Sequence, residues 1–179
     1  MTTTIPAGTE LTGDYVLDTT RTRLAFVGRS LLFVKVRGHF EEFEGSAHLD
    51  GDDPSRSGAR LTIRAHSIQT HHQKRDDHLR SGDFLAADDH PVITFASTGV
   101  QRVSETDFAV TGDLTVRDVT RPVTVRLRLT GAESDRPGGY RVGFTGRATI
   151  DRTEWGITWG RGMVGRKVTL EFEVAARRP

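Results

Sequence analysis

The sequence contains no cysteine, so the chain has no disulfide, no thiol nucleophile and no Cys-ligated zinc or iron–sulfur site. It also lacks a run of about 18 apolar residues, the length that a membrane-spanning helix needs. The opening Met1–Pro6 segment has neither a basic nor an apolar region, which predicts no secretory signal and a cytoplasmic location. An excess of one charge is missing too, because 25 Lys and Arg residues face 24 Asp and Glu residues. This balance disfavours a general nucleic-acid binder.

A period-two alternation of apolar and polar residues fills most of the 179 residues and is clearest over 123–129, 140–150 and 168–174. It is also clear over Phe108–Val116, and less regular segments with the same pattern are Leu24–Arg29, Leu32–Arg37, Phe43–Leu49, Leu61–Ser67 and Ile93–Val100. Successive side chains of a strand point to opposite faces, so each segment has one dry face and one wet face. Many such strands at regular spacing favour an antiparallel sandwich or a closed barrel.

One stretch, Ile68–Asp89, breaks the alternation. Its spacing predicts a short helix over His71–Leu79, with Thr70 as the capping residue. No linker rich in Pro, Gly or Ser divides the chain, and no segment repeats. We therefore expect a flexible N-terminus over residues 1–13 and a single β domain over residues 14–179.

Arginine supplies 22 of the 25 basic residues. An arginine excess is typical of phosphate recognition, because the guanidinium group pairs bidentately with phosphate. Here Arg126, Arg128, Arg141 and Arg147 fall on the wet faces of alternating strands. The pattern favours a surface role for the excess.

The inward faces mix bulky residues with very small ones. Small residues such as Gly45, Gly112 and Gly146 would leave room for one apolar ligand in a barrel of about eight strands. The alternative is a filled core in which the small residues mark bulges or close strand crossings. Both interpretations are open at this level.

The densest polar cluster spans His71–His90. His72 and Asp76 are four residues apart, so on a helix they share a face and suit a metal site or a base with its orienting carboxylate. The alternative is a solvated helix face with local ion pairs. No Gly-x-Ser-x-Gly elbow is present, and the GxGxxG spacing of Gly160–Gly165 lacks the strand and helix that such a loop needs. Two nearby tryptophans, Trp155 and Trp159, suit either the rim or the plug of a barrel.

Seven short segments in order resemble the YceI-like family of polyisoprenoid-binding, lipocalin-like proteins. They are Gly38–Gly45, Ser67–Thr70, Arg75–Phe84, Pro91–Ser97, Gly112–Arg117, Ile150–Ile157 and Val164–Val168. The resemblance covers about Asp14–Val174 and implies an antiparallel lipocalin-like β-barrel of about eight strands, with the helical or loop insertion near residues 69–89. It also implies a long apolar lumen that takes up an isoprenoid chain or a similar lipid.

The chain departs from the family pattern at two positions, where Arg21 and Ser30 replace histidines. The family motif over Arg75–His78 is kept, and we interpret it as holding the 68–89 segment against the barrel.

Together these features predict non-covalent binding and carriage of an isoprenoid or fatty-acyl-type lipid, with no catalytic residue, cofactor or metal, no nucleic-acid partner and a possible homodimer. The alternatives are a hydrolase or metal-assisted enzyme that uses the 71–90 cluster, and a ligand-free structural or stress-related barrel. The predicted ligand-binding residues are Phe26, Phe43, Phe84, Phe95, Phe108, Phe144, Gly146, Ile150, Trp155 and Trp159.

Overall fold

The computed structural model describes residues 8–30 and 33–179 of the chain. The strands are β1 (Gly13–Leu17), β2 (Arg23–Ser30), β3 (Val34–Phe40), β4 (Phe43–Leu49), β5 (Gly58–Arg64), β6 (Ile68–Gln69), β7 (Val92–Arg102), β8 (Asp107–Val116), β9 (Val119–Arg136), β10 (Gly139–Asp151) and β11 (Lys167–Arg178). The helices are α1 (Gly8–Leu11) and α2 (Gln73–Arg80), with 3-10 turns η1 (Pro54–Arg56), η2 (Ala65–Ser67) and η3 (Arg152–Trp155).

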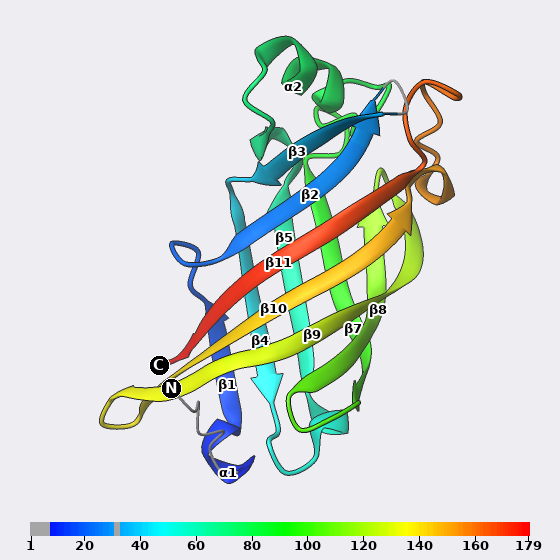
Figure 1. Cartoon of the computed structure of the whole chain (residues 1–179). Coiled ribbons are helices and arrows are strands. Elements are labelled where there is room, and N and C mark those ends of the chain that lie inside the picture. Colours follow the sequence, from blue (N-terminus) through cyan, green and yellow to red (C-terminus); the bar gives the residue numbers. More distant parts are fainter. Residues whose placement is uncertain (1–7, 31–32) are drawn as a thin grey trace.

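The strands form a closed antiparallel barrel with eight strand positions (Figure 1). The hydrogen-bonded order is β1-β4-β5-β7-β8-β9-β10-β11, and pairing between β1 and β11 closes the ring. Strand β2 continues the position of β1, since β11 pairs with β2 along Thr169–Glu173 and with β1 at Ala176–Arg177. Strands β3 and β6 continue β4 and β5 in the same way. Closure removes the free edges that an open sheet of this length would expose.

The alternation places one face of each strand inside the barrel. Between β10 and β11, for example, Gly146 pairs with Phe172 on the inner side and Arg147 pairs with Glu171 on the outer side. The all-β barrel predicted from the sequence is thereby confirmed. Leu32, at the start of one predicted strand, lies outside the described residues.

Three strand predictions need correction. Alternation overlooked β1, which is only five residues long, and it overlooked the two-residue β6. The predicted strand over Leu61–Ser67 ends at Arg64, because the fully buried Ala65 begins a 3-10 turn. Strands as short as β1 and β6 contain too few alternating positions for the period-two pattern to be recognised.

The predicted flexible N-terminus over residues 1–13 falls partly outside the described residues, which begin at residue 8. Of the remainder, Gly8–Leu11 form α1 and Gly13 begins β1. The side chain of Arg178 reaches this segment and donates to the carbonyl oxygens of Glu10 and Thr12, each at 2.8 Å.

The insertion contains the predicted helix, but its start differs. Helix α2 begins at Gln73, and its capping residue is His72, whose Nδ1 accepts from the Arg75 amide at 3.2 Å. Thr70 cannot cap because His71 has a φ of 61°, outside the helical region. The Thr70 amide and hydroxyl instead donate to the buried carboxylate of Asp76.

The barrel has two distinct ends (Figure 1). The α2 end carries α2, η3, the 156–166 segment and the tips of β2 and β3. The α1 end carries α1, the β4–β5 connection with η1, and the β7–β8 and β9–β10 turns. A hydrophobic cluster that includes Trp155 and Ile157 lies toward the α2 end, and a separate cluster around Tyr15 and Tyr140 lies at the α1 end.

Candidate functional site: the barrel lumen

A cavity of about 680 Å³ occupies the barrel. Its lining runs from Leu11 and Asp50 at the α1 end to Ser30, His78 and Trp159 at the α2 end. This volume lies within the range of pockets that hold small-molecule ligands. The barrel is therefore hollow, and the filled-core interpretation does not describe it.

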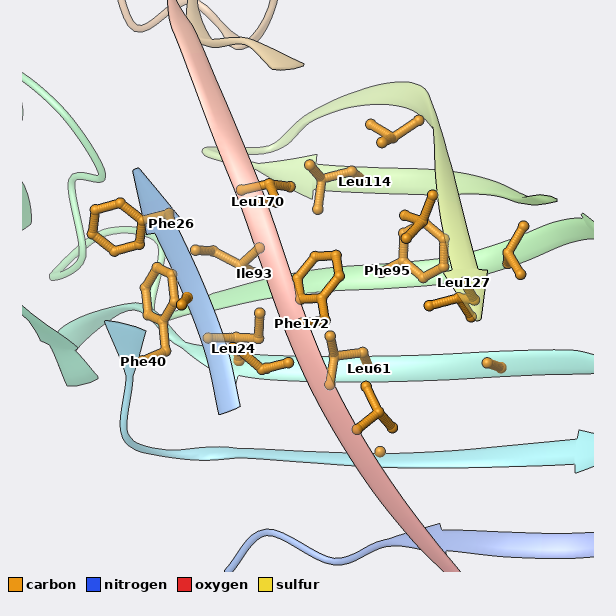
Figure 2. A pocket seen from close by; sticks show the side chains of 18 of the residues that line it. Leu24, Phe26, Phe40, Leu61, Ile93, Phe95, Leu114, Leu127, Leu170 and Phe172 are labelled. Carbon is orange, nitrogen blue, oxygen red and sulfur yellow. The ribbon is translucent and has the colours of Figure 1, made fainter. Parts of the chain in front are cut away.

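The middle of the cavity is apolar on every side. In Figure 2 the labelled side chains, which come from β2, β3, β5, β7, β8, β9 and β11, point toward one another across this space. The labelled ones are Leu24, Phe26, Phe40, Leu61, Ile93, Phe95, Leu114, Leu127, Leu170 and Phe172. No charged side chain lies among them, so a ligand segment in the middle of the cavity meets only hydrocarbon.

Seven of the ten predicted ligand-binding residues line this cavity. They are Phe26, Phe84, Phe95, Phe108, Phe144, Ile150 and Trp159. Phe43, Gly146 and Trp155 are not among the lining residues: Phe43 and Trp155 pack in the core cluster, and Gly146 lies beneath the side chains of Leu127 and Phe172. Whether these residues bind a ligand stays a prediction.

Two of the small inward residues, Gly112 and Gly146, make room for a neighbouring side chain and not for a ligand. A Cβ atom at Gly112 would lie 2.4 Å from the ring of Phe95, and one at Gly146 would lie 2.5 Å from Leu127. Gly28 differs, since it lines the cavity and a Cβ atom there would meet nothing within 4 Å. Of these three glycines, Gly28 alone has open space before it.

Several lining residues were not among the ligand-binding residues predicted from the sequence. Leu114, Leu127, Leu170 and Phe172 lie on inward faces that alternation does identify. The prediction favoured aromatic residues and passed over leucines, although a leucine contributes apolar lining just as a phenylalanine does. It also left out Phe172, which alternation places inward. Period-two position alone, without regard to size, would have found them.

At the α2 end, the lining becomes mixed and aromatic. The rings of His78 and Trp159 meet edge to face with centroids 4.3 Å apart, and Phe84 lies 5.0 Å from His78. His78 Nε2 lies 2.9 Å from Asp83 Oδ2, which orients the imidazole ring. Ser30, one of the two positions that depart from the family pattern, lines the same mouth, while Arg21 is exposed in the β1–β2 turn.

The two tryptophans have different positions. Trp155 is 2% exposed, and its Nε1 donates to the Leu114 carbonyl oxygen at 2.9 Å, so it plugs the barrel beside the cavity. Trp159 is 42% exposed and stands at the mouth. The sequence left open whether the tryptophans form the rim or the plug of the barrel. In the structure Trp159 lies at the rim and Trp155 forms the plug.

The 156–166 segment is held by the buried guanidinium group of Arg152. Its three nitrogens donate to the carbonyl oxygens of Gly165, Ile157 and Val164 at 2.9, 2.9 and 3.1 Å. Burial lowers the pKa of Arg152, yet the group stays charged since arginine titrates far above neutral pH. The hydrogen bonds of this one side chain thus take the place of the strand-to-strand backbone hydrogen bonds that the irregular segment lacks.

Asp151 anchors the same segment. Its carboxylate accepts from the Thr153 hydroxyl at 2.6 Å and from Arg166 Nη2 at 2.7 Å. These hydrogen bonds, the Thr153 bond foremost, lower the pKa of Asp151 from 3.8 to about 2. The carboxylate is therefore ionised throughout the physiological pH range.

The polar cluster of the insertion holds the segment in place and forms no metal centre. Arg75 donates to the Thr70 carbonyl oxygen, and Arg80 donates to those of His66 and Ile68. Asp76 faces Thr70 while His72 caps α2, so the pair predicted to share one face does not converge. Among the residues that the structure describes, no group of three His, Asp or Glu side chains is placed to hold a metal ion.

Comparison with known proteins assigns the family. The model of the YceI-like domain matches residues 15–176. The chain belongs to the YceI-like family. An UPF0312 protein of Pseudomonas paraeruginosa is 37% identical over 178 residues, which cover 96% of this chain and 91% of that protein.

Two solved structures have the same barrel. Burkholderia cenocepacia BcnA superposes with a TM-score of 0.78 at 21% identity, over 89% of this chain and 98% of BcnA. A polyisoprenoid binding domain from Saccharophagus degradans, implicated in plant cell wall breakdown, superposes with a TM-score of 0.71 at 17% identity, over 92% of this chain and 98% of that one. At these identities the likeness concerns the fold. In the described part of this YceI-like chain, no helix is long and apolar enough to cross a membrane.

Proposed function

We propose that this protein binds one long apolar chain, of the isoprenoid or fatty-acyl class, non-covalently in the barrel lumen and carries it without a chemical reaction. The observation that carries the proposal is the 680 Å³ cavity, whose middle is lined by apolar side chains from seven strands. The name of the Saccharophagus degradans relative supports the isoprenoid class as the ligand. The cytoplasmic location stays a prediction from the sequence.

The volume suits a chain more than a compact ring. A cavity of about 150 Å³ lined by Leu, Ile and Phe side chains holds one benzene molecule. On that scale the 680 Å³ cavity has space for roughly four six-carbon groups, or a chain of about 24 carbons. Its lining reaches both ends of the barrel, which matches an extended ligand.

Apolar burial sets the affinity. Each methylene group that enters the cavity contributes about 0.8 kcal/mol, so about two methylenes raise the affinity tenfold. In a series of isoprenoid alcohols, affinity should rise with chain length until the cavity is full and then level off. An affinity independent of chain length would contradict lumen binding.

A blocking substitution tests the site. In Gly28→Phe the new ring should extend into the open space before Gly28 and occupy the cavity, which should lower the affinity for geranylgeraniol at least tenfold. The matched control is Gly99→Phe, because Gly99 is exposed on β7, does not line the cavity and likewise has nothing within 4 Å of its Cβ position. Binding is measured by the change in tryptophan fluorescence, to which Trp159 at the mouth of the cavity contributes.

A second block guards against a local effect at Gly28. Ala47→Phe on β4 enters the cavity from another strand, and it should give the same loss. If both folded variants bind geranylgeraniol as wild type does, the lumen is not the binding site. If the wild-type protein binds no chain of any length, the ligand-free barrel becomes the better description.

A further inference from the structure

Exposed apolar side chains gather at the α2 end of the barrel. Among the described residues, six large hydrophobic side chains are exposed, and four of them belong to two neighbouring connections at this end. Phe33 (85% exposed) and Val34 lie at the tip of the β2–β3 connection, and Trp159 and Met163 (56% exposed) lie in the 156–166 segment. A tip of this composition is costly to leave in water, so it indicates a partner.

The two connections form one surface. The Gly165 amide donates to the Arg29 carbonyl oxygen at 2.8 Å, and Ser30 forms a β-bridge with Val164. Figure 1 shows the tips of β2 and β3 beside the 156–166 segment. Because Arg152 and Asp151 anchor this segment, the apolar side chains stand on a fixed support.

A band of cations borders this apolar tip. Arg29 and Lys35 are opposite each other on β2 and β3, and Lys167 begins the adjoining strand β11. Arg161 lies in the 156–166 segment itself. All four are exposed, and in the parts of the chain that the structure covers none forms an ion pair. The nearest carboxylate in the strand register, Asp151, is already engaged by Arg166 and Thr153.

The same surface surrounds an opening of the cavity. Arg29, Ser30, Trp159, Val164 and Gly165 all line the lumen as well as the tip. An apolar chain that leaves the lumen here meets exposed hydrophobic side chains before it meets water. The surface thus joins the lumen to whatever the tip contacts.

We propose that this tip, formed by Phe33, Val34, Trp159 and Met163 with the cations Arg29, Lys35, Arg161 and Lys167, docks on an anionic lipid bilayer. Aromatic and aliphatic side chains insert at the headgroup level, and the bordering cations pair with anionic headgroups. The inference rests on the proposed function for its purpose, since a docked barrel exchanges its apolar ligand with the bilayer. A second copy of the chain is a poorer occupant, because the four cations of each copy would face those of the other.

Flotation with lipid vesicles tests the proposal. The wild-type protein should float with vesicles of phosphatidylcholine and phosphatidylglycerol in equal parts, and not with phosphatidylcholine alone. Phe33→Ser combined with Met163→Ser should lower the partition coefficient about tenfold. Lys35→Glu combined with Arg161→Glu should lower it about a hundredfold, because each reversal replaces an attraction by a repulsion.

Matched controls lie away from the tip. Val103→Ser removes an exposed valine from the α1 end, and Arg126→Glu with Arg136→Glu reverses two exposed cations elsewhere on the barrel. Both should float as wild type does. The lumen-blocked Gly28→Phe should also float, so a failure of ligand binding and a failure of docking are separable.

Three results would overturn the proposal. The first is no flotation of the wild-type protein with anionic vesicles, and the second is equal flotation of tip and control variants. The third is a dimer, detected by analytical ultracentrifugation, that Phe33→Ser dissociates. The last result would assign the tip to a second copy of this chain.

Discussion

The two ends of the barrel are held together by different interactions. At the α1 end, Tyr15, Tyr140 and their neighbours form a buried apolar cluster beneath short connections such as residues 103–106 and 137–138. At the α2 end, the longer connections over 70–91 and 152–166 contain little regular pairing. There, arginine side chains donate to backbone carbonyl oxygens that have no strand partner.

The difference teaches where the arginine excess is used. Four arginines, Arg75, Arg80, Arg117 and Arg152, donate to main-chain carbonyl oxygens of the α2 end, while Arg102 and Arg178 do so at the α1 end. A guanidinium group has five donors in a rigid fork, so one residue can satisfy several carbonyls of an irregular segment. The surface interpretation of the excess holds for exposed strand residues such as Arg126, but it overlooked this structural use.

The ends also carry separate chromophores. Both tryptophans of the chain lie at the α2 end, and both tyrosines lie in the cluster at the α1 end. Tryptophan fluorescence and tyrosine absorbance therefore report on opposite ends of one molecule. This separation makes the comparison between the ends measurable.

The largest effect should come from Arg152→Leu. The substitution leaves the carbonyl oxygens of Ile157, Val164 and Gly165 without their charged donor, which should lower the free energy of unfolding by about 3 kcal/mol. Urea unfolding followed by far-UV circular dichroism, which reports on the whole barrel, measures it in both variants. Arg102→Leu at the α1 end removes one exposed bond to Ser104 and should change stability by less than about 0.5 kcal/mol. An equal loss of stability in Arg152→Leu and Arg102→Leu would contradict the proposed difference between the two ends.

A smaller loss of stability should follow when either buried aromatic side chain loses its hydrogen bond to a main-chain carbonyl oxygen, and the loss should differ between the two ends. Trp155→Phe removes the donor to the Leu114 carbonyl oxygen and leaves a void, which should cost about 2 kcal/mol. Tyr15→Phe at the α1 end removes only the hydroxyl that donates to Leu11, and it should cost about 1 kcal/mol. Thermal unfolding of both variants checks the order, and a reversed order would show that the α1 end depends more on polar contacts.

The smallest effect should be the pH dependence that Asp151 contributes at the α2 end. The folded-state pKa of Asp151, about 2, lies below the ordinary value of 3.8, so protonation favours the unfolded state. This contribution is complete above about pH 4 and is lost as the pH falls toward 2. Asp151→Asn should remove the corresponding part of the acid transition in tryptophan fluorescence.

The matched variant for this test is Asp107→Asn at the α1 end. The hydrogen bond from Arg128 lowers the pKa of Asp107 as well, but this pair is remote from both tryptophans. Its fluorescence transition should match that of the wild type. A shifted transition in Asp107→Asn would mean that the two ends unfold as a single unit in acid.

Prediction from the sequence succeeded where a local period carries the information. The long strands follow from alternation, because burial on one face repeats every two residues. The cap of α2, the short strands β1 and β6, and the bonds of Arg152 were not predicted, since they depend on contacts that no local period encodes. For the lumen, alternation identifies the inward positions, but the rings over Gly112 and Gly146 follow from the packing of neighbouring strands.

The central claim, that the hollow barrel carries an apolar chain, is tested most directly by native mass spectrometry of the protein purified from its own host. We predict one lipid of the isoprenoid or fatty-acyl class per chain in the wild-type protein and in Gly99→Phe, and none in Gly28→Phe. A wild-type protein that is repeatedly free of lipid, or a Gly28→Phe variant that retains the lipid, would contradict the account.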